Sequence, residues 1–225
     1  MHIGLIGGIG PAATEFYYRG LIDGHAKANV ALDLTIVHAD VREMAGNLAN
    51  GDASKQADTF AALVRRLAAA GADLAAVTSM GGHFCIRELQ GMSPLPILNA
   101  LPEVAAEIER KQFKTVGILG TRMVMETRLY GVISSAAVVV PEGEALVEVH
   151  KNYAEMATAG RVTKAQQQVF FSAGMALHRD RGADVVLLGG TDLFLAFQAG
   201  DCGFPVLDCA GIHLKALCKK SVGSA

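Results

Sequence analysis

Short apolar runs alternate with longer amphipathic stretches along the whole chain. The apolar runs, in which β-branched residues are common, predict strands near residues 3–6, 34–38, 74–78, 96–98, 115–119, 136–140, 184–188 and 205–207. The stretches between them predict helices near residues 12–28, 54–70, 83–90, 100–111, 122–133, 143–158, 164–181, 192–198 and 210–219. This alternation is typical of an α/β protein whose parallel sheets are covered by helices on both faces.

The pattern is repeated within the chain. The tripeptide Gly-Ala-Asp ends an amphipathic segment and opens an apolar run at residues 71–73, and it does so again about 110 residues later. Two further pairs keep nearly the same offset, residues 3–7 with 116–120 and residues 96–99 with 205–208. Three matches in the same order indicate a duplicated α/β unit, although strand–helix units also resemble one another without duplication.

The repeat predicts a domain organisation. We expect two similar parallel-sheet α/β lobes, residues 1–98 plus 209–225 and residues 99–208, related by a pseudo-two-fold axis with a ligand cleft between them. In open α/β sheets, ligands bind beyond the carboxyl ends of the strands. This rule points to the loops at residues 7–14, 78–83, 120–122 and 189–192.

Composition narrows the class of protein. The chain has 225 residues, 51% of them hydrophobic, which is sufficient for one large domain or two small lobes. Its net charge of −2 offers no footprint for nucleic acid or an anionic membrane. No apolar run reaches the roughly 18 residues of a membrane span, and the first ten residues or so predict a strand and a turn, not a signal peptide. The four cysteines lack metal-site spacing, which favours a reduced, cytoplasmic location.

A glycine-rich segment, Gly7–Thr14, follows the first predicted strand. Gly8 and Gly10 permit positive φ and a close approach of the backbone to a ligand, and a helix N-terminus after them favours an anion. The spacing Gly8-x-Gly10-x-x-Ala13 also fits a loose dinucleotide-binding fingerprint, although the acidic residue expected about 20 positions later is not clearly placed. A tight turn made only for packing is the remaining alternative.

Several segments together resemble one known family. They are Gly7–Thr14, Ser79–His83 in place of Cys-Asn-Thr-x-His, Gly120-Thr121, Gly189–Asp192 in place of Gly-Cys-Thr-Glu, and Pro205–Asp208. In order and spacing this set resembles the cofactor-independent aspartate/glutamate racemases, whose superfamily includes hydantoin racemases, arylmalonate decarboxylases and maleate isomerases. The resemblance covers nearly the whole chain. It implies an isomerase of amino acid metabolism that uses no pyridoxal phosphate, other cofactor or metal, and that forms a homodimer.

At two positions this sequence departs from the pattern of the family it resembles. Racemases of this family are understood to use two cysteines, one on each face of the substrate Cα, to remove and return the α-proton. Here the first position holds Ser79, or Thr78 if the alignment shifts by one, and the second holds Gly190. A serine hydroxyl is a poor base without an activating neighbour, and glycine has no side chain to act. We therefore do not expect racemisation by two thiols.

Candidate site residues follow from the resemblance. The candidate catalytic residues are Ser79, Thr78, His83 and Thr191. The candidate substrate-binding residues are Gly8, Ile9, Gly10, Met80, Gly81, Thr121, Gly190 and Thr191. A histidine can act as a base near neutral pH, but a helix-start histidine bonded to the backbone is an equal interpretation of His83. We expect Cys85 to point away from Ser79, Cys209 to lie in the core, and Arg42 to be either a surface residue or a partner for a carboxylate.

The sequence thus predicts a racemase-like protein that acts on or binds a small molecule bearing one or two carboxylates. One alternative is a one-sided lyase, decarboxylase or isomerase of the same superfamily, which needs a single acid/base group. Another is a non-catalytic binder of an acidic metabolite. A dinucleotide-dependent oxidoreductase is a third, and it rests on the glycine spacing alone.

Overall fold

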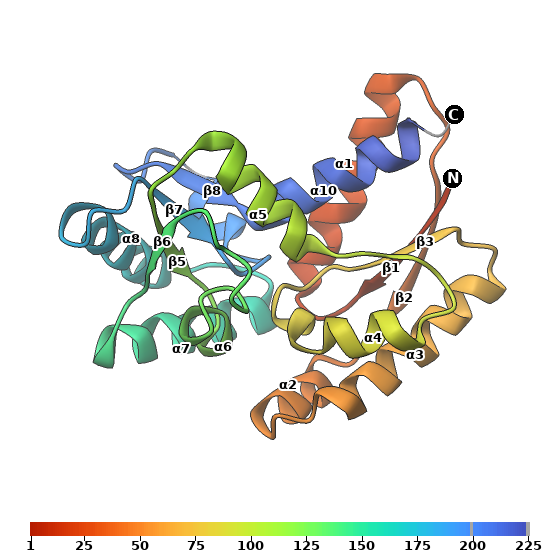
Figure 1. The fold of residues 1–225 in the computed structure, drawn as a ribbon, viewed down its shortest axis with the longest axis horizontal. Helices are drawn as coiled ribbons and strands as arrows, with labels where there is room; N and C mark the ends of the chain where they lie inside the picture. The colour runs from red at the N-terminus through yellow and green to blue at the C-terminus, as the bar shows by residue number, and fades with distance from the viewer. Residues whose placement is uncertain (199, 224–225) are drawn as a thin grey trace. The chain divides into compact units, whose positions relative to one another are not determined.

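The computed structural model describes residues 1–198 and 200–223. The chain divides into two compact units. Unit 1 contains Met1–Asn99 and the chain from His213 onward, and unit 2 contains Ala100–Ile212. Within the described residues, each unit has its own four-stranded sheet (Figure 1).

The two sheets have the same topology. The sheet of unit 1 has the order β2-β1-β3-β4, formed by β1 (His2–Gly7), β2 (Asp33–His38), β3 (Leu74–Val77) and β4 (Ile97–Leu98). The sheet of unit 2 has the order β6-β5-β7-β8, formed by β5 (Thr115–Leu119), β6 (Ala137–Val139), β7 (Val185–Leu188) and β8 (Val206–Asp208). Every pairing is parallel. All the predicted strands are present, and the prediction of two similar α/β lobes is confirmed.

The helices of unit 1 include one pair that glycines allow to pack closely. They are α1 (Pro11–Ala28), α2 (Val41–Ala49), α3 (Ala53–Ala69), the 3₁₀ turn η1 (Gly81–Cys85), α4 (Ile86–Met92) and α10 (Cys209–Val222), whose last part belongs to this unit. Helices α1 and α10 lie side by side (Figure 1). A Cβ on Gly24 would lie 2.6 Å from Cys218 Sγ, and one on Gly20 would overlap Leu214. These two glycines, one turn apart, let the helices approach each other.

The helices of unit 2 are α5 (Ala100–Lys111), α6 (Arg122–Glu126), α7 (Gly143–Ala159), α8 (Lys164–Arg179) and α9 (Phe194–Phe197). Helices α7 and α8 share a hydrophobic core with β5 and β7, which includes Leu119, Leu146, Val149, Tyr153, Met156, Phe170, Leu177, Val186 and Leu188. Their apolar positions recur every three or four residues, so one face of each helix is buried against the sheet.

The helices differ from the sequence prediction in three places. Helix α2 was not predicted; it begins after Asp40, whose side chain accepts a hydrogen bond from the Arg42 amide (2.7 Å). The helix predicted over residues 122–133 ends at Glu126, because residues 128–131 all have positive φ. The helix predicted near residues 83–90 is divided into η1 and α4.

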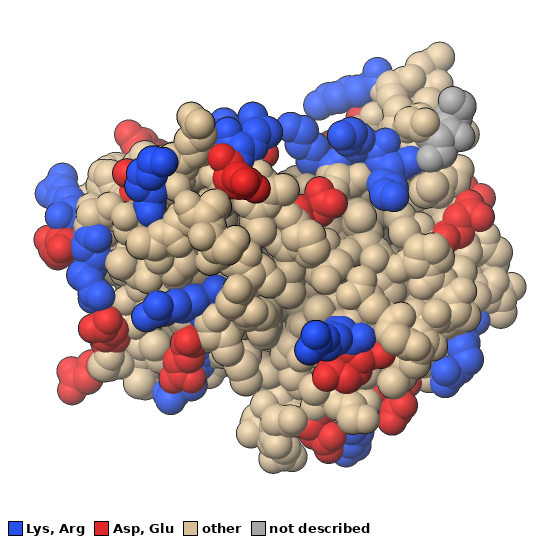
Figure 2. Space-filling model, viewed as in Figure 1, with Lys and Arg blue, Asp and Glu red and all other residues tan. Residues whose placement is uncertain are grey.

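Charged residues are distributed without a dominant sign. On the face shown in Figure 2, acidic and basic side chains occur over both units with uncharged surface between them. Arg42 pairs with Asp40 and Arg181 with Glu142, each at 3.0 Å and in solvent. Within the part of the chain that the structure describes, no helix has the length and apolar character needed to cross a membrane.

Candidate functional site

The glycine turn after β1 is held by a side chain of its own segment. Gly8 and Gly10 have φ of 89° and 96°, and a Cβ on Gly8 would lie 2.6 Å from the Ala39 carbonyl oxygen. Thr14 Oγ1 accepts a hydrogen bond from the Gly8 amide (2.9 Å) and donates to the Gly10 carbonyl (3.2 Å). The Gly8 amide therefore has a partner inside the turn, and Ile9 is buried beside it. These contacts favour the packing role for the turn.

The end of β3 carries two buried hydroxyl groups with different surroundings. Thr78 Oγ1 donates to the Ile6 carbonyl (3.0 Å) and so ties β3 to β1. Ser79 Oγ accepts from the Gly82 amide (3.2 Å) at the start of η1, next to the buried Met80 and Gly81. The proton of the Ser79 hydroxyl has no acceptor among the described residues, so of the two hydroxyls Ser79 retains a hydrogen to donate.

His83 and His213 form a buried pair in unit 1. His83 Nδ1 lies 2.7 Å from the Ser79 carbonyl, and its ring centroid lies 6.0 Å from that of His213. His213 Nε2 lies 3.0 Å from the Leu98 carbonyl, so Nε2 carries the proton and Nδ1 accepts from the Tyr17 hydroxyl (2.9 Å). Burial lowers the pKa of His83 to about 4 and, with the nearby His83, that of His213 to about 3.

These values describe imidazoles that stay neutral at pH 7. A neutral imidazole whose conjugate acid has a pKa near 4 is a weak base. The hydrogen bond of His83 to the backbone of Ser79 instead orients the loop that carries the serine. The contacts thus favour the helix-start interpretation of His83.

In unit 2 the end of β5 meets the end of β7. Thr121 is the N-cap of α6, and its Oγ1 accepts from the Val124 amide (3.3 Å). A Cβ on Gly120 would lie 3.2 Å from the Gly189 backbone, so the two strand ends are in contact. The Arg122 amide donates to His150 Nδ1 (3.2 Å) on α7.

The loop after β7 contains a buried hydroxyl that has no hydrogen-bond partner among the described residues. Thr191 is 2% exposed, and its Oγ1 is buried with no hydrogen-bond partner among the described residues. Buried hydroxyls normally have a partner, and leaving one unsatisfied costs roughly 1–3 kcal/mol. Asp192 beside it is also buried, and it accepts a hydrogen bond from the Tyr153 hydroxyl (3.4 Å). The Thr191 hydroxyl is therefore a buried polar group whose hydrogen-bonding capacity is not used by the described residues.

Gly190 lies beside the ring of Tyr153. A Cβ on Gly190 would lie 2.6 Å from Tyr153 Cζ and 2.8 Å from its Oη. Burial first, and then the charge of Asp192, raise the pKa of Tyr153 well above its ordinary value. The phenol is therefore protonated at neutral pH.

The two buried cysteines, Cys85 and Cys209, do not carry activated thiols. Burial raises the pKa of Cys85 to about 12, and its Sγ donates to the Gly82 carbonyl (3.4 Å). Burial and the adjacent Asp208 raise the pKa of Cys209 well above its usual range. Because the thiolate is the reactive form, neither thiol is activated.

Asp208 ends β8 and immediately precedes α10. Its carboxylate accepts hydrogen bonds from the amides of Ala210 (3.0 Å) and Gly211 (3.2 Å). Desolvation by burial is the largest effect and raises the pKa of Asp208 to about 6, although the two hydrogen bonds act in the opposite direction. The carboxyl therefore titrates close to neutral pH.

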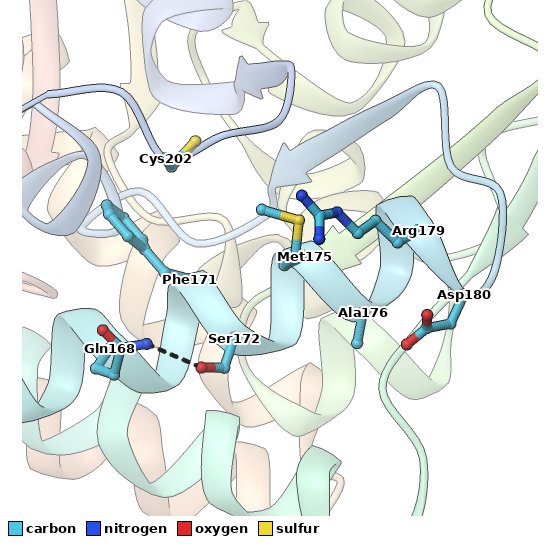
Figure 3. A pocket seen from close by; sticks show the side chains of 8 residues that line it. All are labelled: Gln168, Phe171, Ser172, Met175, Ala176, Arg179, Asp180 and Cys202. Atoms are coloured by element: carbon cyan, nitrogen blue, oxygen red, sulfur yellow. Dashed lines mark hydrogen bonds between the residues drawn. The ribbon is translucent and has the colours of Figure 1, made fainter.

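A separate hollow of about 550 Å³ lies on the outer side of α8 (Figure 3). Its walls include Phe171, Met175, Arg179 and Cys202, and Gln168 Nε2 donates to Ser172 Oγ (3.2 Å) along the helix. None of the residues predicted for the site lines it. Its polar groups lie in solvent, whereas the Thr191 hydroxyl is enclosed.

Sequence reasoning missed three residues that shape these loops: Tyr17, Tyr153 and His213. Each stands on the buried face of a helix and contacts residues far away in the chain, across 196 positions for Tyr17 and His213. Only the helical spacing of buried positions pointed to them, and that spacing does not distinguish a core residue from a site residue.

The fold and these loops define a class of protein: two similar parallel-sheet units with glycine turns and buried hydroxyls at the carboxyl ends of their central strands. The family model described as Asp/Glu/hydantoin racemase matches residues 6–217. The chain belongs to this family.

Solved structures agree with that assignment. A candidate Asp/Glu racemase from Yersinia pestis is 25% identical, with a TM-score of 0.82 over 99% of this chain and 100% of that one. An aspartate racemase homologue from Pyrococcus horikoshii OT3 is also 25% identical, with a TM-score of 0.77 over 99% of each chain. The aspartate racemase of Picrophilus torridus, at 18% identity, shares the fold with a TM-score of 0.74 over 99% of this chain and 95% of that one.

Proposed function

We propose that this protein binds a small acidic molecule with one or two carboxylates, such as aspartate or glutamate, and does not racemise it with two thiols. The observation that carries the proposal is the buried, unpartnered hydroxyl of Thr191 at the end of β7. A carboxylate accepting that hydrogen bond would satisfy it, and charge-assisted hydrogen bonds are the stronger kind. The solved relative from Pyrococcus horikoshii OT3, which is described as an aspartate racemase homologue, supports this ligand class.

The remaining predicted residues would contribute to the same function. They are Gly8, Ile9, Gly10, Met80 and Gly81 in the loops after β1 and β3 of unit 1, and Thr121 and Gly190 in the loops after β5 and β7 of unit 2. We further propose that the protein uses no cofactor or metal, forms a homodimer and is cytoplasmic. Light scattering of the purified chain tests the homodimer, and cell fractionation tests the location.

The exclusion of two-thiol chemistry rests on the residues present. By the resemblance described above, Ser79 and Gly190 stand at the two positions where racemases of the family carry cysteines. The two buried thiols, Cys85 and Cys209, have pKa values raised by burial. Thiolates on two faces of a ligand are therefore not expected at neutral pH.

Thermal melting with candidate ligands tests the binding proposal. The two enantiomers of aspartate and of glutamate, and succinate, should each be compared with asparagine, which lacks the second carboxylate. We expect a dicarboxylate to raise the melting temperature of the wild type and to lose most of that effect in Thr191→Val. Thr127→Val is the matched control, because it removes a hydroxyl that already donates to the Met123 carbonyl. This variant should retain the ligand effect. An equal ligand effect in Thr191→Val and wild type would contradict the proposal.

A second candidate function is one-sided proton transfer, in a lyase, decarboxylase or isomerase. The observation that favours it is the Ser79 hydroxyl, which is buried and keeps a proton to donate. In D₂O, NMR of aspartate or glutamate would reveal exchange of the α-proton. Exchange that is lost in Ser79→Ala would establish this candidate. Binding without exchange would favour the non-catalytic one.

A further inference from the structure

Gly190 is a glycine because of its neighbour and not because of its backbone. Its φ is not in the left-handed region that favours glycine. A Cβ at this position would instead meet Tyr153, 2.6 Å from Cζ and 2.8 Å from Oη. Side-chain carbons do not approach other atoms that closely, so the ring and any side chain at position 190 exclude each other.

The ring is fixed in this place by its helix. Leu146, Val149, Tyr153 and Met156 recur at helical spacing on the buried face of α7, and the same core contains Leu188 of β7. Tyr153 is only 6% exposed, and its hydroxyl donates to Asp192 Oδ2. The packing and this hydrogen bond hold the phenol at the end of β7.

We propose that Tyr153 is a specificity-determining residue: its ring occupies the space of a side chain at position 190, so that a ligand at this strand end meets the Thr191 hydroxyl and no side chain from the preceding residue. The proposal rests on the proposed function for its ligand. It also means that a cysteine side chain fits at position 190 only if the Tyr153 ring is replaced by a smaller side chain.

A double-mutant cycle tests the exclusion. The variants are Gly190→Ala, Tyr153→Leu and both together. Leucine ends at its Cδ atoms, so Tyr153→Leu fills the core but removes the ring atoms that approach position 190. We expect Gly190→Ala to lower the melting temperature by roughly 3–10 °C in the wild type, and by much less in Tyr153→Leu.

Gly46→Ala is the matched control. Gly46 lies within α2, and a Cβ there would have no atom within 4 Å. This change should leave the melting temperature equal or slightly higher in both backgrounds. If Gly190→Ala behaves like Gly46→Ala in the wild type, or if its effect is the same in both backgrounds, Tyr153 does not exclude a side chain.

Thiol labelling tests whether position 190 faces a ligand. If Tyr153 had a purely structural role, a ligand would not change the labelling rate at this position. In Gly190→Cys with Tyr153→Leu, native labelling should modify one thiol more than in Tyr153→Leu alone. A dicarboxylate that stabilises the protein should slow this labelling. Labelling of the introduced thiol only after unfolding would overturn the inference.

The two proposals fail in different ways. If no dicarboxylate shifts the melting temperature of the wild type, the proposed function is wrong, yet the mutant cycle and the labelling still decide the role of Tyr153. If ligands bind but the cycle shows no coupling, the ligand class stands and the inference about Tyr153 is wrong.

Discussion

At the scale of single residues, burial decides which groups titrate and which do not. His83, His213, Tyr153, Cys85 and Cys209 are all held neutral by desolvation. Neutral groups of this kind position their neighbours more readily than they transfer protons near pH 7. Such a distinction is invisible in the sequence, because it depends on what surrounds each side chain.

Asp208 gives a residue-scale prediction with a defined sign. Its pKa is about 6 in the folded protein and 3.8 in its reference state. The folded state therefore holds its proton more tightly, and the resulting stabilisation is complete below pH 4 and lost as the pH rises to about 6. Relative to Asp208→Asn, the free energy of unfolding of the wild type should fall by about 1–3 kcal/mol between pH 4 and pH 7. Urea titrations at several pH values measure this; parallel curves would contradict it.

His213 gives a second prediction at this scale. In His213→Phe the hydroxyl of Tyr17 and the carbonyl of Leu98 both lose a partner inside unit 1. An unsatisfied buried polar group costs roughly 1–3 kcal/mol, so we expect a loss of at least that size in the free energy of unfolding. The double variant with Tyr17→Phe also removes the hydroxyl that lost its bond to His213, so part of the loss should be recovered. Full additivity of the two changes would count against the hydrogen bond.

At the scale of elements, caps and turns determine where the helices begin and end. Asp40 caps the start of helix α2, which the hydrophobic pattern did not predict. A single capping carboxylate can start a helix, and one polar residue does not change a hydrophobic pattern. Residues 128–131 end another helix because their φ values are positive, and three of the four are not glycine. Nothing in the local sequence demands that conformation, and it is the surrounding fold that stabilises it.

Helix α8 gives the prediction at this scale. Thr163 and Gln166 form a capping box, in which Thr163 Oγ1 accepts from the Gln166 amide (3.2 Å) and Gln166 Oε1 accepts from the Thr163 amide (3.0 Å). Thr163→Ala should lower the free energy of unfolding by about 1 kcal/mol. Thr163→Ser retains the hydroxyl and should lose little. Chemical denaturation of both variants provides the measurement, and an equal loss in the two would show that the hydroxyl is not responsible.

At the scale of the whole chain, the repeated topology places equivalent loops at equivalent strand ends, while the residues in those loops differ. The end of β3 retains a hydroxyl at Ser79, and the end of β7 has a glycine backed by an aromatic ring. The two units thus share a topology but not the side chains at these strand ends.

The four thiols give a prediction for the chain as a whole. Cys85 and Cys209 are fully buried, whereas Cys202 and Cys218 are half-buried. Under native conditions a thiol reagent should modify at most Cys202 and Cys218, and Cys85 and Cys209 should react only as fast as the protein opens. Mass spectrometry of labelled peptides identifies the order. Rapid native labelling of Cys209 would show that the loop around it opens locally.

The sequence by itself determined the strands, the order of the repeated units, the family and the absence of cysteines at positions 79 and 190. These properties are local, since period, turn residues and motif letters are read within short windows. The tertiary structure alone decided that Tyr153 fills the space beside Gly190, that the Thr191 hydroxyl has no partner, and that His83 is buried and neutral. The physical reason is that excluded volume, hydrogen-bond satisfaction and desolvation depend on residues distant in the chain, as Tyr153 is from Gly190.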